Sequence, residues 1–164
     1  MMGPMAAEHT YALTVAWTGN RGTGTSGYRD YDREHTVTAP GKPLLRGSAD
    51  TAFRGDPGGW NPEELLVAAL SQCHMLSYLA LAAREGVVVA GYTDHPTGRM
   101  RVNPDGSGEF TEVVLTPQVT VADPSMVAAA ERLHADAHGT CFIARSVNFP
   151  VAHRATVIVE STTR

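Results

Sequence analysis

The stretch NPEELLVAALSQCHMLSYLALAAREG, residues 61–86, carries the strongest structural signal in the sequence. Asn61 is a favourable N-cap, Pro62 suits the first helical position, and Glu64 completes the pattern of a capping box. Gly86 can adopt the left-handed conformation that ends a helix. The stretch therefore predicts one helix of roughly 24 residues, about 36 Å long at 1.5 Å per residue.

The same helix has about the length and the apolar character of a membrane span. Its centre, however, holds the polar quartet SQCH at residues 71–74, and polar side chains in mid-membrane are costly. We therefore expect a helix of a soluble protein, without membrane contact, that is buried on most of its circumference. In a chain of this size, that burial would need a second subunit as well as a sheet.

Composition narrows the class of protein. The chain has 164 residues, of which 43% are hydrophobic and 18% charged, and this fits a single domain over residues 1–164. The net charge of −4 and the scattered arginines offer no basic stripe for nucleic acid. Because a signal-peptide pattern is absent and two cysteines are too few for a disulfide scaffold, we expect a cytoplasmic protein. Residues 1–5 are expected to be disordered or to come from the expression vector.

Strand patterns flank the helix on both sides. Alternating residues predict strands before it, a hairpin around PDGSG after it, and a strand at the end of the chain. Asp123 and Pro124 open a second helix that is expected to end near His138, with Gly139 after it. Because strands and helices do not alternate as βαβ units, the fold class is α+β. The expected strands cover residues 9–17, 31–38, 44–49, 98–103, 109–121 and 151–160, with a strand and loop over 87–98 and a loop over 53–60.

The two cysteines are the first candidates for chemistry. Cys73 lies inside the first expected helix and Cys141 just after the second. Lone buried thiols often act only as small hydrophobic side chains. Cys73, however, belongs to a polar quartet in an apolar helix, where packing alone would select alanine or leucine.

Two other kinds of chemistry are open to these thiols. His134, His138 and Cys141 could bind a metal ion together with Cys73, although their spacing is loose. A nucleophilic pair of Cys73 with His138 could support acyl transfer, but no third residue stands out to orient the histidine. We expect no metal ion and no other cofactor.

Two segments resemble a known family. NPEELLVAALSQCHMLSYLALAAREG is similar to the catalytic-helix motif of the OsmC/Ohr family, the osmotically inducible and organic-hydroperoxide-resistance proteins. HADAHGTCFIARSVNFPV, residues 134–151, resembles that family's second-cysteine segment, and the TGNRG turn fits as well. The resemblance implies an OsmC-like α+β fold, with antiparallel sheets wrapped around long central helices in an intertwined homodimer.

The resemblance also implies a function. It implies a thiol-dependent peroxidase that reduces organic hydroperoxides. Cys73 would be the peroxidatic cysteine, Cys141 the resolving cysteine, and Glu63 the residue that holds an activating arginine. The reductant would be a dithiol of the lipoyl type or a small thiol. The alternative is a non-enzymatic relative that senses redox state or binds a small molecule.

The activating arginine is ambiguous. Arg21 follows the first strand, as in the hydroperoxide-resistance branch, whereas Arg54 lies near the position used in the osmotically inducible branch. Phe142 stands where the hydroperoxide-resistance branch usually has proline. A helix dipole fades within one turn and burial raises the pKa of a thiol, so an arginine must stabilise a thiolate at Cys73. We favour Arg21, because a preceding strand fixes its direction better than a loop would.

The position of Glu63 suggests a shared site. Glu63 and Cys73 are ten residues apart, about 15 Å along a straight helix. One guanidinium cannot contact both across that distance. Either the helix is broken between them, or Glu63 of one subunit serves Cys73 of the other.

Overall fold

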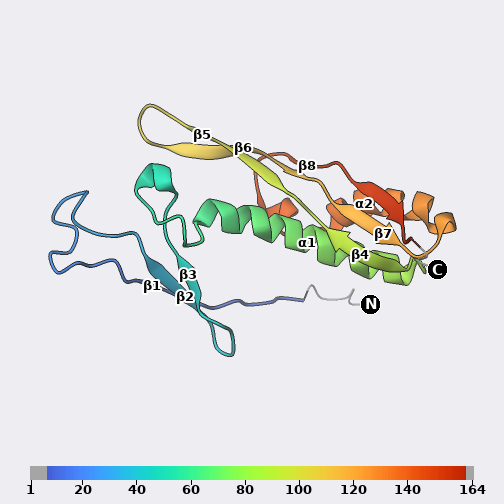
Figure 1. The fold of residues 1–164 in the computed structure, drawn as a ribbon, viewed down its shortest axis with the longest axis horizontal. Coiled ribbons are helices and arrows are strands. Elements are labelled where there is room, and N and C mark those ends of the chain that lie inside the picture. The colour runs from blue at the N-terminus through green and yellow to red at the C-terminus, as the bar shows by residue number, and fades with distance from the viewer. Residues whose placement is uncertain (1–6, 162–164) are drawn as a thin grey trace, which may run out of the picture. The chain divides into compact units, whose positions relative to one another are not determined.

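A computed structural model describes residues 7–161, which form two compact units, 7–65 and 66–161 (Figure 1). The expectation for residues 1–5 lies outside the described residues. A single domain over residues 1–164 stays a prediction.

The N-terminal unit contains a three-stranded antiparallel sheet in the order β1-β2-β3. The strands lie where the sequence pattern predicts them but are shorter, and an ordered loop replaces the start of the second expected strand. In that loop the Asn20 side chain accepts hydrogen bonds from the backbone N–H groups of Gly22 and Gly24. Of the expected loop over 53–60, only its first residue belongs to a regular element, a single 3₁₀ turn. The elements are β1 (Thr14–Trp17), β2 (His35–Thr38), β3 (Leu45–Gly47) and η1 (Thr51–Phe53).

The predicted long helix is confirmed as α1 (Pro62–Arg84). At its start, Asn61 Oδ1 accepts from the Glu64 N–H at 2.8 Å, and Glu64 Oε2 accepts from the Asn61 N–H at 3.2 Å. These reciprocal bonds are the capping box. At its end, Gly86 has φ +73°, and the Val87 N–H reaches back to the Ala82 carbonyl at 2.9 Å. This Schellman arrangement satisfies the last carbonyls of the helix.

The C-terminal unit contains two further three-stranded sheets, β4-β7-β9 and β5-β6-β8. The pairs β6–β8 and β7–β9 are parallel, and the other pairs are antiparallel. Two expected strands are wrong in extent. The run 109–121 is two strands separated at Pro117, and the run 151–160 is two strands that join different sheets. The strands are β4 (Val89–Thr93), β5 (Thr97–Val102), β6 (Gly108–Leu115), β7 (Gln118–Val121), β8 (Val151–His153) and β9 (Thr156–Val159).

The second helix starts as predicted but continues further. Asp123 caps a 3₁₀ turn, η2 (Pro124–Met126), which leads into α2 (Val127–Thr140). The helix thus ends two residues beyond the expected end near His138, and the expected place of Gly139 after the helix is wrong. The Thr140 hydroxyl donates to carbonyls of the last turn, those of Asp136 and Ala137, and so supports one more half-turn. Cys141 then follows as the C-cap residue, ahead of a 3₁₀ turn, η3 (Ala144–Ser146).

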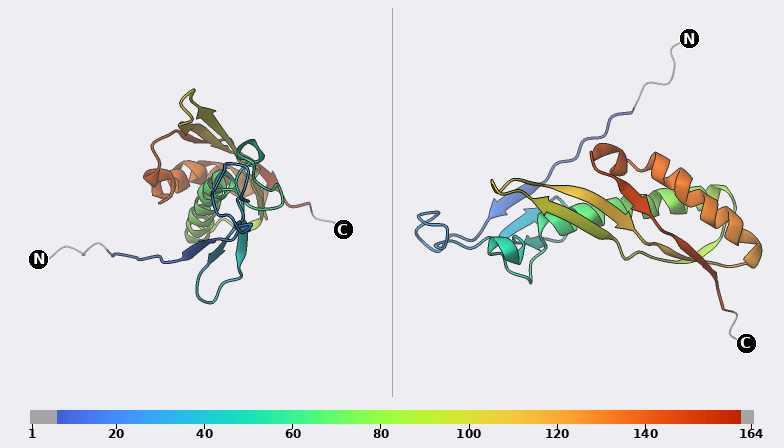
Figure 2. Two further views of the ribbon diagram at one scale, coloured as in Figure 1. Left: turned by 90° about the vertical axis from the view of Figure 1, so that its left-hand side faces the viewer. Right: turned by 90° about the horizontal axis from the view of Figure 1, so that it is seen from above.

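One stripe of α1 is buried in the C-terminal unit: Leu70, His74, Tyr78 and Ala82. Residues of this stripe form a core with α2 and β7, and a smaller buried cluster contains Leu70 of the stripe and two residues of β6, Val113 and Leu115. Figure 2 shows α2 lying alongside α1. The opposite stripe is exposed, and Leu76 is 62% exposed. Within one chain only one stripe of the helix is buried, and burial on most of its circumference, which we expect with cover from a second subunit, stays a prediction. By length and composition alone, α1 could cross a bilayer.

The mixed architecture, with two helices and three small sheets among the described residues, confirms the α+β class.

Candidate functional site

Cys73 opens into an apolar groove in the C-terminal unit. The groove has a volume of about 770 Å³ and is bounded by α1 and by the segment that follows α2. Cys73 itself is half-buried and free, so its thiol is accessible from the groove. Two large apolar side chains at the rim, Leu76 and Phe142, are 62% and 78% exposed. The groove therefore suits an apolar molecule or an apolar protein surface.

Cys141 is a neighbour of Cys73 but has a different environment. It is 1% exposed, and the Ala144 N–H donates to its Sγ at 3.5 Å. Burial, with a smaller effect of the neighbouring Cys73 thiol, raises the pKa of the Cys141 thiol to about 11. Cys141 is therefore protonated at neutral pH, and no disulfide joins it to Cys73.

This asymmetry is chemically useful. A thiolate is the reactive form of cysteine, and an exposed thiol can meet a dissolved oxidant while a buried one cannot. The arrangement thus allows Cys73 to react first and Cys141 to react only with the product formed on Cys73.

Both candidate arginines lie in the N-terminal unit. Arg21 is held within its loop, where its guanidinium donates to the carbonyls of Arg29 and Asp30 and lies 3.7 Å from the Asp32 carboxylate. Arg54 follows η1 and is exposed, with φ +66°, the left-handed region. Positive φ is uncommon for a residue with a side chain. Arg21 is thus the more firmly oriented of the two.

Glu63 lies in the first turn of α1 and is half-buried. Because α1 runs without a break from Pro62 to Arg84, the alternative of a broken helix between Glu63 and Cys73 is wrong. Of the predicted site residues, Cys73 and Cys141 are neighbours in the C-terminal unit. The other three, Arg21, Arg54 and Glu63, belong to the N-terminal unit.

The structure also gathers four histidines that the sequence did not predict as a group. His74 on α1, His134 and His138 on α2 and His153 on β8 form a cluster with ring centroids 5.4 to 6.0 Å apart between neighbours. Two signals pointed to it: the His134–His138 spacing of four residues and the polar His74 in an apolar helix. Within residues 7–161, no group of three or more His, Cys, Asp or Glu side chains could hold a metal ion.

The two inner histidines, His74 and His134, are the most buried, each 1% exposed. Their Nε2 and Nδ1 atoms, respectively, lie 3.1 Å apart. Burial, with smaller effects of the neighbouring histidines, lowers the pKa of each to about 4. Both rings are therefore neutral at pH 7. Their outer nitrogens, His74 Nδ1 and His134 Nε2, are buried without a hydrogen-bond partner, which costs about 1–3 kcal/mol for each such atom.

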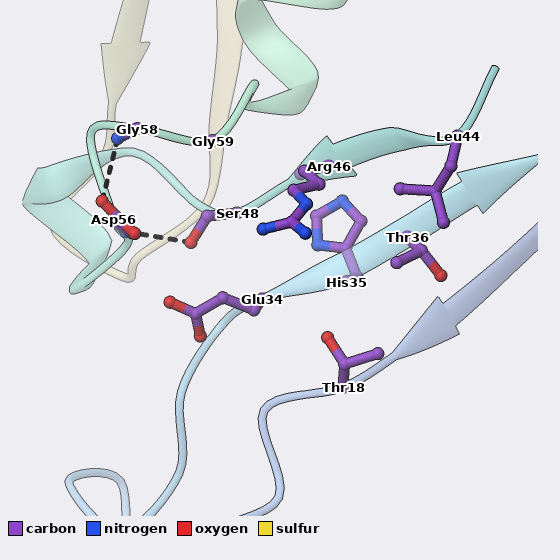
Figure 3. Close-up of a pocket in the computed structure, with 11 residues that line it drawn as sticks. Thr18, Glu34, His35, Thr36, Leu44, Arg46, Ser48, Asp56, Gly58 and Gly59 are labelled. Carbon is purple, nitrogen blue, oxygen red and sulfur yellow. Dashed lines mark hydrogen bonds between the residues drawn. The ribbon is translucent and has the colours of Figure 1, made fainter.

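A separate cavity lies in the N-terminal unit (Figure 3). Its volume is about 390 Å³, and Glu34, His35, Arg46 and Ser48 are among the lining residues. Glu34 Oε2 is buried without a hydrogen-bond partner. The His35 ring packs directly on Gly47, where a Cβ atom would lie only 2.2 Å from His35 Nε2. The cavity could accept a small molecule that donates a hydrogen bond to Glu34.

The chain is thus an α+β protein in which two neighbouring thiols form no disulfide, and of these thiols one opens into an apolar groove and the other is buried. The family model for OsmC-like proteins matches residues 55–155, and this chain belongs to the OsmC-like family.

Relatives of the chain extend the match beyond these residues. An OsmC-like protein of unknown function from Vibrio cholerae is 33% identical, with a TM-score of 0.80 over 91% of this chain and 100% of that one. The uncharacterized protein YmaD of Bacillus subtilis is 26% identical over 86% of this chain and 88% of its own length. An organic hydroperoxide resistance protein from Legionella pneumophila shares the fold, with 20% identity and a TM-score of 0.65 over 93% of this chain and 100% of that one.

Proposed function

We propose that this protein is a thiol-dependent peroxidase that reduces organic hydroperoxides. The observation that carries the proposal is the asymmetry of the two thiols, since Cys73 opens into an apolar groove while Cys141 is buried beside it. An apolar groove favours an organic peroxide over a polar one. The structurally similar protein from Legionella pneumophila, described as an organic hydroperoxide resistance protein, is in keeping with this assignment.

The proposed reaction has three steps. The Cys73 thiolate attacks the terminal oxygen of the peroxide, the O–O bond breaks, and the leaving alkoxide takes up a proton to become an alcohol. The Cys141 thiol then attacks the sulfur of the Cys73 sulfenic acid, which forms a disulfide and releases water. A dithiol reductant of the lipoyl type, or a small thiol, restores both thiols by exchange.

One experiment tests the function directly. Treatment with one equivalent of cumene hydroperoxide should remove both thiols of each chain and form one intramolecular disulfide, measured by thiol titration and intact mass. Two untouched thiols would contradict a peroxidase. That result would favour a small-molecule-binding protein, for which the cavity with the unpaired Glu34 Oε2 is the candidate site (Figure 3).

We further propose a homodimer with the active site at the subunit interface. Exposed apolar side chains occur in both units, on β1 (Val15 and Trp17), on α1 (Leu76) and after α2 (Phe142), and surfaces of this kind often mark an interface. A dimer would also let Glu63 of one subunit hold the arginine that contacts Cys73 of the other. Within one chain the unbroken helix keeps Glu63 and Cys73 about 15 Å apart, too far for one guanidinium to contact both.

The dimer predicts a sedimentation result. The protein should sediment as a dimer at micromolar concentration, and Leu76→Glu should shift it towards monomer because the charge would be buried in the interface. Ala135→Glu, at an exposed position of α2 outside the groove, is the matched control and should stay dimeric. A wild-type monomer under these conditions would contradict both the dimer and the shared site.

A further inference from the structure

We propose that the hydrogen-bonded pair His74–His134 is a clamp between α1 and α2 that holds Cys141 in place for disulfide formation with Cys73. His74 and His134 are then positioning residues, because they act through the helices that carry the two thiols. The inference rests on the proposed peroxidase function for its biological role, although the clamp itself can be tested without a peroxide.

The two histidines of the clamp lie close in sequence to the two cysteines. His74 directly follows Cys73 on α1, and His134 lies seven residues, about two turns, before Cys141. Their ring nitrogens are 3.1 Å apart across the helix pair. The His134 ring also stacks on Tyr78 of α1, with 4.2 Å between centroids.

Other polar links between the helices lie further from Cys141. The Tyr78 hydroxyl donates to the Ala130 carbonyl at 3.0 Å, and Arg132 pairs with Glu85 at the exposed end of α1. Among these links, the histidine pair is the one nearest in sequence to Cys141. Loss of the pair would therefore loosen the end of α2 while the rest of the helix stays attached.

The surroundings keep both rings neutral, a state in which they can share the hydrogen bond. A neutral imidazole has one N–H donor and one acceptor nitrogen, so two neutral rings can share one bond, whereas two protonated rings present N–H to N–H. The facing titratable groups are Tyr78 on α1, His138 on α2, His153 on β8 and Asp94 just after β4. Asp94 is occupied by other partners, since it accepts from the Ser71 hydroxyl at 2.5 Å and from the Thr116 N–H at 2.7 Å.

Packing alone does not explain the pair. Two apolar side chains of similar size would fill the same space and leave no buried atom unpaired, yet both outer nitrogens lack a partner among the described residues. Departures from the best packing choice are expected mainly where a function requires them. The tertiary contact joins residues 60 positions apart, beside the two thiols.

The test separates the two thiol steps in full-length variants. His134→Phe keeps a ring over Tyr78 but removes Nδ1, whereas His134→Asn keeps a hydrogen-bonding group near that position. His153→Phe is the matched control, because it removes an imidazole of the same cluster that makes no hydrogen bond to the pair among the described residues. Stopped-flow mixing with cumene hydroperoxide measures sulfenate formation and disulfide formation, and diamide oxidation measures disulfide formation without a peroxide.

In His134→Phe, we expect disulfide formation to slow about tenfold or more with either oxidant, while sulfenate formation stays within about twofold. His134→Asn should recover most of the rate, and His153→Phe should resemble wild type. An unchanged disulfide rate in His134→Phe, an equal loss in His153→Phe, or no recovery with asparagine would overturn the clamp. Failure of wild type to react with cumene hydroperoxide would instead contradict the peroxidase, and the diamide rates would still decide the clamp. If His134→Phe does not fold, His74→Phe, which removes Nε2, the other partner of the hydrogen bond, replaces it in the same comparison.

Discussion

Cys73→Ser is expected to abolish peroxide consumption, because a serine hydroxyl is not ionised at neutral pH and cannot take the place of the thiolate. The remaining thiol, Cys141, is 1% exposed and burial raises its pKa to about 11. It therefore cannot substitute for Cys73. Steady-state consumption of cumene hydroperoxide with a dithiol reductant should fall to the rate measured without protein.

Cys141→Ser separates the two roles. This variant should still consume one equivalent of peroxide per chain and stop at the Cys73 sulfenic acid, which dimedone labelling and intact mass would detect. Turnover should then depend on direct reduction by external thiol. Loss of that first equivalent in Cys141→Ser, with retention in Cys73→Ser, would reverse the assigned roles.

Arg21→Ala is expected to have the second largest effect. If the Arg21 guanidinium stabilises the Cys73 thiolate, its removal should shift the midpoint of Cys73 alkylation upward by about one to three pH units. Each unit corresponds to about 1.4 kcal/mol and up to tenfold less thiolate at pH 7. Alkylation rates against pH, measured with iodoacetamide in a Cys141→Ser background, give this midpoint.

The structure supplies the reason for favouring Arg21. Its guanidinium is oriented by the carbonyls of Arg29 and Asp30 and by Asp32, so little side-chain freedom would be lost on binding a thiolate. Arg54→Ala should have a much smaller effect. Arg99→Ala, which removes an exposed arginine paired with Glu112 in the C-terminal unit, is the matched control. A larger shift in Arg54→Ala than in Arg21→Ala would show that Arg54 is the activating residue.

Some features of this protein follow from short stretches of sequence. The start and end of α1 are examples, since the bonds of Asn61 with Glu64 and of Val87 with Ala82 join residues no more than five positions apart. Such bonds form wherever the right residues follow one another, so their pattern is readable in the sequence. The α+β class follows from the order of these local patterns.

Other features depended on distant residues. The run 109–121 was predicted as one strand because its apolar residues alternate without a break, but β6 and β7 pair with different strands on either side of Pro117. The last strand divides for the same reason, since β8 pairs with β6 and β9 with β7. Local propensity does not specify which partner a strand will find.

The candidate site divides in the same way. That two cysteines lie beside two helices can be read directly from the sequence, and their predicted roles come from the resemblance of their segments to one family. The burial of Cys141 next to Cys73, and the contact between His74 and His134 across 60 residues of chain, arise only when the chain folds. Burial and electrostatic environment arise from side chains that converge from separate elements, and it is these that set the pKa of Cys141 and the neutral state of the histidine pair.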